Sequence, residues 1–85
     1  MGKRIAIVTG AAKGIGKAIA ERLISENYYV IAVDVDEKNG KLLLTRFNKT
    51  KLRFSKADIC KEKIVKLLFE KIIREYKRID VLVNN

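Results

Sequence analysis

The stretch "IVTGAAKGIGKAIAERL", residues 7–23, decides the fold. A short apolar run ends in a glycine, two more glycines follow, and then apolar residues recur at helical spacing. Three glycines within seven residues weaken any regular element, so they indicate a loop that another group must approach closely. A helix that starts in such a loop offers unpaired N–H groups and a partial positive charge, which favour a phosphate. The glycines are Gly10, Gly14 and Gly16.

The spacing of this loop is G-x-x-x-G-x-G, which differs from the common dinucleotide spacing G-x-G-x-x-G. Gly10 permits a tight turn, and we expect Gly14 and Gly16 to let a cofactor and the strand approach the start of the helix. A second signal is Asp34, which ends the next apolar run. A carboxylate there can accept hydrogen bonds from the adenosine ribose hydroxyls. Together, loop and acid predict a dinucleotide site.

The rest of the chain alternates between continuous apolar runs and segments with helical periodicity. The strongest apolar stripe predicts a helix over residues 61–77, whereas Gly40 counts against the helix predicted over 37–47. Asn27 is suited to end the first helix in a left-handed conformation. The predicted strands are 4–9, 28–33, 52–57 and 80–84, and the first helix starts at Ile15.

This order, β-α-β-α-β-α-β, predicts an α/β fold with a parallel sheet and right-handed crossovers. A reversal after the third strand gives the strand order 3-2-1-4, a partial doubly wound, Rossmann-like sheet. Ligands bind such sheets at the carboxyl ends of the strands where the order reverses. Those ends are Thr9-Gly10 and Asn84-Asn85.

Size and composition narrow the class of protein. The 85 residues suffice for one small domain, and a hydrophobic content of 48% excludes a disordered chain. No apolar run approaches the roughly 20 residues that span a bilayer, so we expect no membrane partner. A single cysteine cannot form an internal disulfide, and we expect a reducing, cytoplasmic location.

The net charge of +9 is carried by the second part of the chain. Residues 1–37 are neutral, while residues 38–85 hold all the excess of lysine and arginine. A basic patch can bind nucleic acid, and a small basic nucleic-acid-binding module is an alternative function. We favour solvated lysine-rich helix faces, because the basic residues are spread over several elements without a base-stacking aromatic pattern.

Two other chemistries are disfavoured. Ala11, Gly16 and Lys17 nearly match the spacing of a nucleoside triphosphate loop, but Ala18 stands where the Mg²⁺ ligand should be Ser or Thr. Cys60 precedes a predicted helix, where the pKa of a thiol can be lowered. With no second cysteine, we interpret it as a small residue at the place of an N-cap.

Four segments in this order resemble the short-chain dehydrogenase/reductase family, and the resemblance covers all 85 residues. "TGAAKGIG" (9–16) resembles the family's cofactor loop, and "VDVDE" (33–37) its ribose-binding strand end. "ADI" (57–59) is similar to the segment that holds the adenine ring, and "DVLVNN" (80–85) to the run into an N-N-A-G motif.

The resemblance implies the cofactor contacts and NAD as the cofactor. Asp58 would lie at the adenine N6 amine with Ile59 against the ring. Asp34 would accept from the 2′-hydroxyl and repel a 2′-phosphate, and Asp36 adds negative charge nearby. Lys13 is the contrary sign, because family members that prefer NADP often carry a basic residue there. The expected cofactor-binding residues are Gly10, Lys13, Gly14, Ile15, Gly16, Asp34, Val35, Asp58, Ile59 and Asn85.

The sequence also departs from the family, because the family's catalytic Asn, Ser and Tyr-x-x-x-Lys lie downstream of Asn85. Tyr28, Tyr29 and Tyr76 have no Lys four residues on and cannot substitute. We therefore expect residues 1–85 to be the N-terminal part of an NAD-binding Rossmann domain without catalytic residues. The parent activity implied is hydride transfer between NAD and an alcohol or ketone. A non-catalytic nucleotide-binding module is the alternative.

The predicted strand 80–84 is an edge without a lysine or proline to discourage pairing. Right-handed crossovers leave one helix to cover one face of the sheet. We expect part of a face built from Ile5, Ile7, Val81 and Val83, or their neighbours, to be bare. Self-association or a missing complementary segment would cover it.

Overall fold

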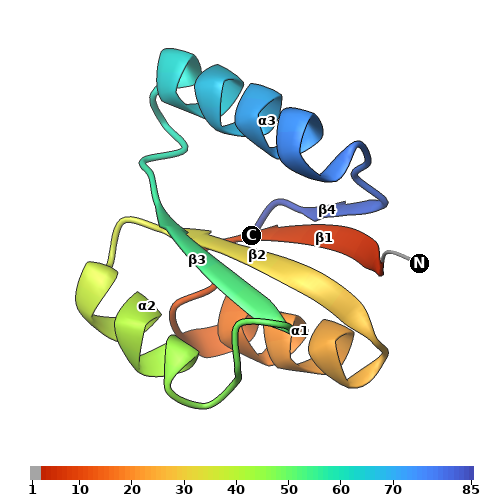
Figure 1. The fold of residues 1–85 in the computed structure, drawn as a ribbon. Helices are drawn as coiled ribbons and strands as arrows, with labels where there is room; N and C mark the ends of the chain where they lie inside the picture. Colours follow the sequence, from red (N-terminus) through yellow and green to blue (C-terminus); the bar gives the residue numbers. More distant parts are fainter. Residues whose placement is uncertain (1–2) are drawn as a thin grey trace.

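The computed structural model describes residues 3–85 and contains a four-stranded sheet between two layers of helices (Figure 1). Helices α1 and α2 cover one face of the sheet, and α3 covers the other (Figure 1). The elements, in order, are β1 Arg4–Thr9, α1 Gly14–Ser25, β2 Tyr28–Asp34, α2 Glu37–Leu44, β3 Leu52–Lys56, α3 Glu62–Tyr76 and β4 Val81–Val83.

The sheet is parallel throughout, with the order β3-β2-β1-β4. This confirms the Rossmann-like fold, the element order and the strand order predicted from the sequence. β1 pairs along its whole length with β2, from Arg4 opposite Tyr28 to Thr9 opposite Val33. The pairing aligns the carboxyl ends of the two strands, so the glycine loop and the residues after Asp34 meet at one edge of the sheet.

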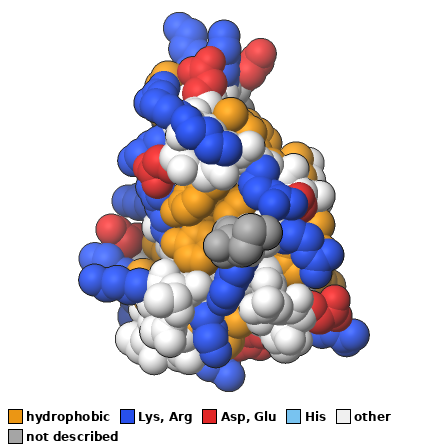
Figure 2. All heavy atoms as spheres, turned by 45° about the vertical axis from the view of Figure 1, so that its right-hand side comes forward, with side chains coloured by type: hydrophobic (Ala, Val, Ile, Leu, Met, Phe, Trp, Pro, Cys, Tyr) orange, Lys and Arg blue, Asp and Glu red, His pale blue; other side chains and the backbone are white. Residues whose placement is uncertain are grey.

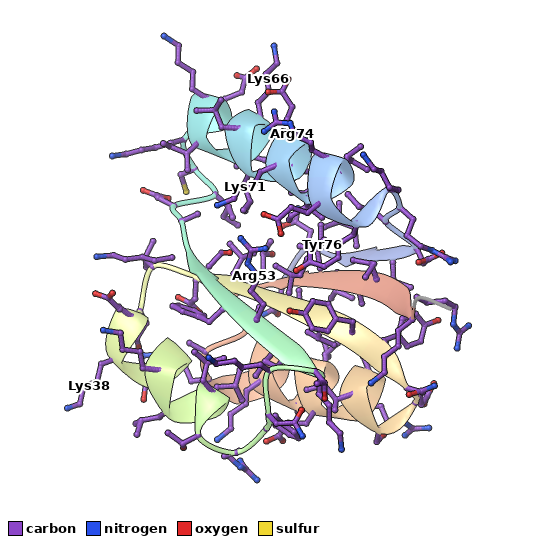
Figure 3. All side chains as sticks on the ribbon, viewed as in Figure 1. Lys38, Arg53, Lys66, Lys71, Arg74 and Tyr76 are labelled. Atoms are coloured by element: carbon purple, nitrogen blue, oxygen red, sulfur yellow. The ribbon has the colours of Figure 1, made fainter. Side chains whose placement is uncertain are left out.

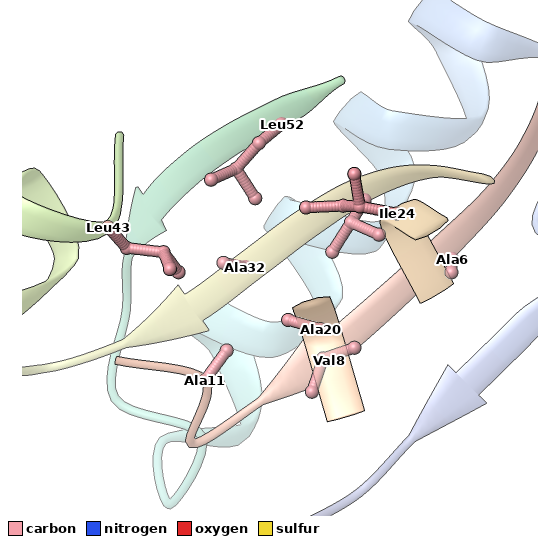
Figure 4. Close-up of a cluster of buried hydrophobic side chains, with 9 residues drawn as sticks. Ala6, Val8, Ala11, Ala20, Ile24, Ala32, Leu43 and Leu52 are labelled. Carbon is pink, nitrogen blue, oxygen red and sulfur yellow. The ribbon is translucent and has the colours of Figure 1, made fainter. Parts of the chain in front are cut away.

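Each face of the sheet has its own hydrophobic core. Ala20 and Ile24 of α1 and Leu43 of α2 pack on one face, where alanines keep the layers close (Figure 4). On the other face, Ile72 of α3 is fully buried against the sheet. The sheet residues of the first core are Ala6, Val8, Val30, Ala32 and Leu52, and those of the second are Ile5, Ile7, Ile31 and Val33.

Helix α2 is shorter than the predicted 37–47, because it ends at Leu44. Thr45 is its C-cap, and the Thr45 hydroxyl donates to the carbonyl of Leu42 over 2.6 Å. Gly40 is fully part of the helix despite its low propensity. A Cβ on Gly40 would overlap the ring of Phe54, so the glycine lets α2 lie directly on β3.

The other boundaries agree with the sequence within one or two residues, and two helix ends are left-handed. Asn27 has φ 69°, as predicted, and Lys77 after α3 has φ 66°. The N-cap of α3 is Lys61, so the interpretation of Cys60 as occupying that place is wrong. Cys60 is an exposed free thiol in the turn before the helix.

The expectation of a bare face is wrong for most of the residues named for it. Ile5 and Ile7 are buried on the α3 side, whereas Val81 and Val83 belong to the opposite face and pack against the α1–α2 core. The exposed apolar residue of the edge strand is Leu82, which is 50% exposed.

Lys and Arg side chains outnumber acidic ones around a hydrophobic area on the face shown in Figure 2, in keeping with the net charge of +9. Among residues 3–85, no helix combines the length and the apolar character needed to cross a membrane.

Candidate functional site

The glycine loop leaves the start of α1 open. Gly10 has φ 63° directly after β1, and Gly14 has φ 64° where the helix begins. Both values lie in the left-handed region that favours glycine. Lys13 occupies the N-cap position, and within residues 3–85 no side chain caps the first N–H groups of α1. These donors are therefore available to an anion.

The second and third glycines serve different purposes. A Cβ on Gly16 would overlap the carbonyl oxygen of Gly10, so this glycine allows the helix to pack on the loop. A Cβ on Gly14 would meet no described heavy atom within 4 Å, so Gly14 is needed for its φ and faces open space. The open side is the one from which a phosphate could approach the helix start.

Asp34 joins the glycine loop to the turn after β2. Its Oδ2 accepts a hydrogen bond of 3.0 Å from the backbone N–H of Ala12. Its Oδ1 accepts a hydrogen bond of 3.0 Å from the backbone N–H of Asp36. The carboxylate is half-buried at the sheet edge beside the loop, while the next residue, Val35, is 55% exposed.

An ion pair also connects the glycine loop to the turn after β2. The Lys13 ammonium lies 3.9 Å from Oδ2 of Asp36. Asp36 is the N-cap of α2 and accepts hydrogen bonds from the backbone N–H of Asn39 at 3.0 Å and from its Nδ2 at 2.6 Å. The side-chain and backbone donors of Asn39, with a contribution from Lys13, lower the pKa of Asp36 below its usual value.

Asn85 supports the loop from the other side. Its backbone N–H donates to Oγ1 of Thr9 at 3.0 Å, and its Nδ2 donates to the carbonyl oxygen of Gly10 at 3.3 Å. Thr9 is only 4% exposed, and its Oγ1 also lies 3.2 Å from Oδ1 of Asn84. The carboxyl ends of β1 and β4 are thus tied together at the loop.

Asp58 and Ile59 follow β3, one strand further along the sheet. The backbone N–H of Ala57 donates to the carbonyl of Asp34 at 3.1 Å, which holds this segment beside the end of β2. Oδ1 of Asp58 accepts from the backbone N–H of Cys60 at 2.9 Å. Ile59 is 39% exposed and lines a cavity of about 260 Å³ with Thr9 and residues of α3 and β4.

The residues predicted from the sequence therefore gather along one edge of the sheet. Gly10, Gly16 and Asn85 lie in direct contact, and Asp34 is bound to the same loop through the backbone N–H of Ala12. Ile15 lies on the first turn of α1 and is 73% exposed, so the core does not explain its hydrophobic side chain.

Two residues around the loop were not predicted as site residues. Thr9 is a hydroxyl at the end of an otherwise apolar strand, and that contrast is its only sequence signal. Ala12 acts through its backbone N–H, which nearly every residue type has, so the sequence does not reveal this role.

A polar cluster at the opposite end of the sheet links α3 to β2 and β3. Arg53 donates to Glu75 at 2.7 Å and to the hydroxyl of Tyr76 at 3.2 Å (Figure 3). The rings of Tyr29 and Tyr76 lie 5.4 Å apart, and burial, together with Tyr76, raises the pKa of Tyr29 above its usual value. Tyr29 stands at the amino end of β2, so this cluster is remote from the glycine loop.

Within residues 3–85, no group of three or more His, Cys, Asp or Glu side chains could hold a metal ion. The chemistry available at the loop is therefore that of hydrogen-bond donors, one acid at each of positions 34 and 36, and one lysine.

Comparison with known sequences agrees with the geometry. The short chain dehydrogenase family matches residues 4–85. A 3beta-hydroxysteroid dehydrogenase of Mediterraneibacter gnavus is 38% identical over 98% of this chain, and the 15-hydroxyprostaglandin dehydrogenase [NAD(+)] of Mus musculus is 37% identical over 96%. The chain spans about a third of the length of these relatives, 31% and 32% respectively.

Solved structures share the fold. A short chain dehydrogenase from Bacillus anthracis superimposes on 96% of this chain with a TM-score of 0.88 and 23% identity, using 34% of its own length. YwfH, an NADPH dependent reductase involved in bacilysin biosynthesis, covers 98% of this chain with a TM-score of 0.85 and 30% identity, using 37% of its own length. The match of the family along residues 4–85, together with the glycine loop and the parallel sheet, shows that the chain belongs to the short chain dehydrogenase family.

Proposed function

We propose that residues 1–85 form the cofactor-binding N-terminal part of an NAD-dependent oxidoreductase. The observation that carries this proposal is the Asp34 carboxylate beside a glycine loop whose helix start is uncapped among the described residues. An anion is favoured at the helix N-terminus, and an acid one strand away suits a ribose diol. A dinucleotide carries both a pyrophosphate and a ribose diol.

Each part of the site has a role in binding. The N–H groups at the start of α1 would bind the pyrophosphate, and Gly14 leaves room for it. Asp58 would accept from the adenine amine, and exposed Ile59 would pack against the ring. The proposed cofactor-binding residues are Gly10, Lys13, Gly14, Ile15, Gly16, Asp34, Val35, Asp58, Ile59 and Asn85.

We infer NAD in preference to NADP. A carboxylate at position 34 accepts from a 2′-hydroxyl but repels a 2′-phosphate. Among the relatives, one is named for NAD(+) and another as an NADPH dependent reductase, so family membership allows either cofactor. The preference therefore rests on the acids at the end of β2.

The bound nicotinamide would supply hydride transfer between an alcohol and a ketone. This chain would bind and orient the adenosine and pyrophosphate side. The sequence has no Tyr-x-x-x-Lys, and Tyr29 and Tyr76 are held in a cluster at the far end of the sheet. Because the reaction needs a base for the hydroxyl proton, we expect no turnover by the 85-residue chain alone.

Titration with NADH and NADPH tests this function. We expect saturable NADH binding that Asp34→Ala weakens at least tenfold, and an unchanged affinity in Glu70→Ala, which removes an exposed acid from α3. An unchanged cofactor preference in Asp34→Ala would contradict the proposal. Binding of DNA with steep salt dependence, without NADH binding, would support the basic nucleic-acid module instead.

We also propose that a second copy of the chain pairs along β4. The strand β4 lies at the edge of the sheet next to β1 and carries Leu82, whose side chain is 50% exposed. Unpaired backbone groups beside apolar side chains favour strand addition across a two-fold axis. A complementary segment of a longer chain is the competing occupant.

A further inference from the structure

Lys13 stands at a position where its charge matters to any phosphate ligand. It is the N-cap of α1, next to the uncapped N–H groups of the glycine loop, and its side chain is 77% exposed. An ammonium here adds to the positive end of the helix dipole. Without an acidic partner, the Lys13 ammonium would favour a dinucleotide that carries a further phosphate besides the pyrophosphate.

The ammonium is not free in this chain. It lies 3.9 Å from Oδ2 of Asp36, which belongs to the turn between β2 and α2. The partner acid is the more ordered of the two, since its side chain is 26% exposed and accepts two hydrogen bonds from Asn39. The position of the Asp36 carboxylate is therefore fixed by contacts other than the one with Lys13.

The backbone brings the two residues together independently of this ion pair. The N–H of Asp36 donates to Oδ1 of Asp34, and Oδ2 of the same carboxylate accepts from Ala12, the residue before Lys13. Asp34 thus connects the backbone of Asp36 to that of Ala12, the residue before Lys13. These hydrogen bonds hold the backbone of the loop at Lys13 close to the backbone of Asp36, whatever rotamer the lysine adopts.

We propose that Asp36 is a positioning residue for cofactor specificity, which disfavours NADP by pairing with the Lys13 ammonium and so weakening its attraction for a 2′-phosphate. This inference rests on the proposed function of the loop as a dinucleotide site. Asp34 acts directly on the ribose, whereas Asp36 acts through the lysine. The chain thus carries a basic residue suited to a 2′-phosphate together with an acid that engages it.

The expected effect is modest, because the pair is exposed to solvent. Ion pairs of this kind change an equilibrium by about two- to fivefold. Loss of a negative charge near the ribose also helps NADP without any role for Lys13. The test must therefore separate the direct effect of Asp36 on the phosphate from its effect through Lys13.

A double-mutant cycle makes that separation. Asp36→Asn, Lys13→Met and the double variant are titrated with NADH and NADPH, and the ratio of the two dissociation constants is compared. Asn is an equally good N-cap, so α2 keeps its start. We expect Asp36→Asn to shift the ratio toward NADPH by about two- to fivefold more when Lys13 is present than in the Lys13→Met background.

Glu37→Gln is the matched control, because it removes the adjacent acid, which pairs with Lys41 and Lys56 instead of Lys13. Its effect on the ratio should be the same with and without Lys13. NADH binding with strictly additive effects of Asp36→Asn and Lys13→Met would overturn this inference and leave the proposed function intact.

A second measurement does not depend on cofactor binding. The pKa of the Asp36 carboxyl, followed by NMR, should rise when Lys13 is replaced by methionine, and an unchanged value would overturn the pairing. Failure of the wild-type chain to bind either NADH or NADPH would overturn the proposed function and this inference together.

Discussion

The backbone N–H of Ala12 donates a hydrogen bond of 3.0 Å to Oδ2 of Asp34, so the acid that ends β2 holds the loop that follows β1. The other oxygen of the same carboxylate accepts from the N–H of Asp36. Asp34 therefore shapes the loop even without a ligand. A loss of cofactor affinity in an Asp34 variant combines a lost ribose contact with a loosened loop.

Asp34→Ala should lower the stability of the free chain. The substitution leaves the N–H groups of buried Ala12 and half-buried Asp36 without their acceptor, at a cost of about 1–3 kcal/mol. Asp34→Asn retains one oxygen and should lose less. Urea unfolding of the two variants beside Glu70→Ala measures the difference, and equal stability of all three would contradict the role of Asp34 in the loop.

Gly16→Ala should destabilise the chain more than Gly14→Ala. A Cβ at position 16 overlaps the carbonyl oxygen of Gly10, and such overpacking against backbone costs about 3 kcal/mol. At position 14 the Cβ meets open space, and the cost is the left-handed φ alone, roughly 1–2 kcal/mol. Thermal unfolding of both variants checks which one is less stable. A less stable Gly14→Ala would show that the backbone at Gly10 shifts at little cost to make room for the new Cβ.

The element order and the topology follow from the sequence because apolar runs, their spacing and the crossover rule are local or general properties. Contacts between distant residues do not follow from them. Gly40 counts against a helix by propensity, yet α2 needs it because the ring of Phe54 occupies the space of a Cβ. The early end of α2 at Leu44 is likewise set by the bond from Thr45, which periodicity does not reveal.

The site shows the same limit. The sequence identifies Gly10, Gly16 and Asp34 because their residue types are unusual at strand ends. It does not show that Asp34 accepts from the backbone of Ala12, since any residue supplies that N–H. A backbone donor becomes visible only when the two strands are in register.

Lowering the pH should reduce the free energy of unfolding of the chain, in part because Asp80 becomes protonated. Its Oδ2 accepts from the N–H of Ile5 at 2.7 Å, and its two oxygens pair with Arg78. Arg78, then the N–H of Ile5, lowers the pKa of Asp80 below the usual 3.8. The folded chain thus binds this proton less readily than the unfolded chain, so the stabilisation is complete above about pH 5 and is lost as pH falls through the folded pKa.

Asp80→Asn should flatten the dependence of stability on pH below that point, measured by urea unfolding between pH 2 and 7 in about one-unit steps. Asp58→Asn is a suitable control, because that acid accepts only a local turn bond from Cys60. A pH dependence in Asp80→Asn as steep as in the wild type would contradict the assignment.

Leu82→Lys should shift the chain toward the monomer. The lysine places a charge on the exposed edge strand, which discourages addition of a second β4. Leu42→Lys is the control, because Leu42 is similarly exposed at 54% but lies on α2. Sedimentation at high micromolar concentration measures the change. A wild-type monomer with amides protected from hydrogen exchange throughout residues 80–84 would contradict self-association.

The hydrogen bond between Thr9 and Asn85 joins residues 76 positions apart. A ribosome delivers the chain from its N-terminus, so the glycine loop is made well before residues 80–85, which support it. Until residues 80–85 emerge, β1 pairs with a neighbouring strand on one side only, and its other side, which is buried in the finished sheet, stays uncovered. The strand β1 is made before its neighbour β4, so one side of β1 stays unpaired during synthesis of the residues between them. A chaperone that shields apolar strands can bind β1 during that interval.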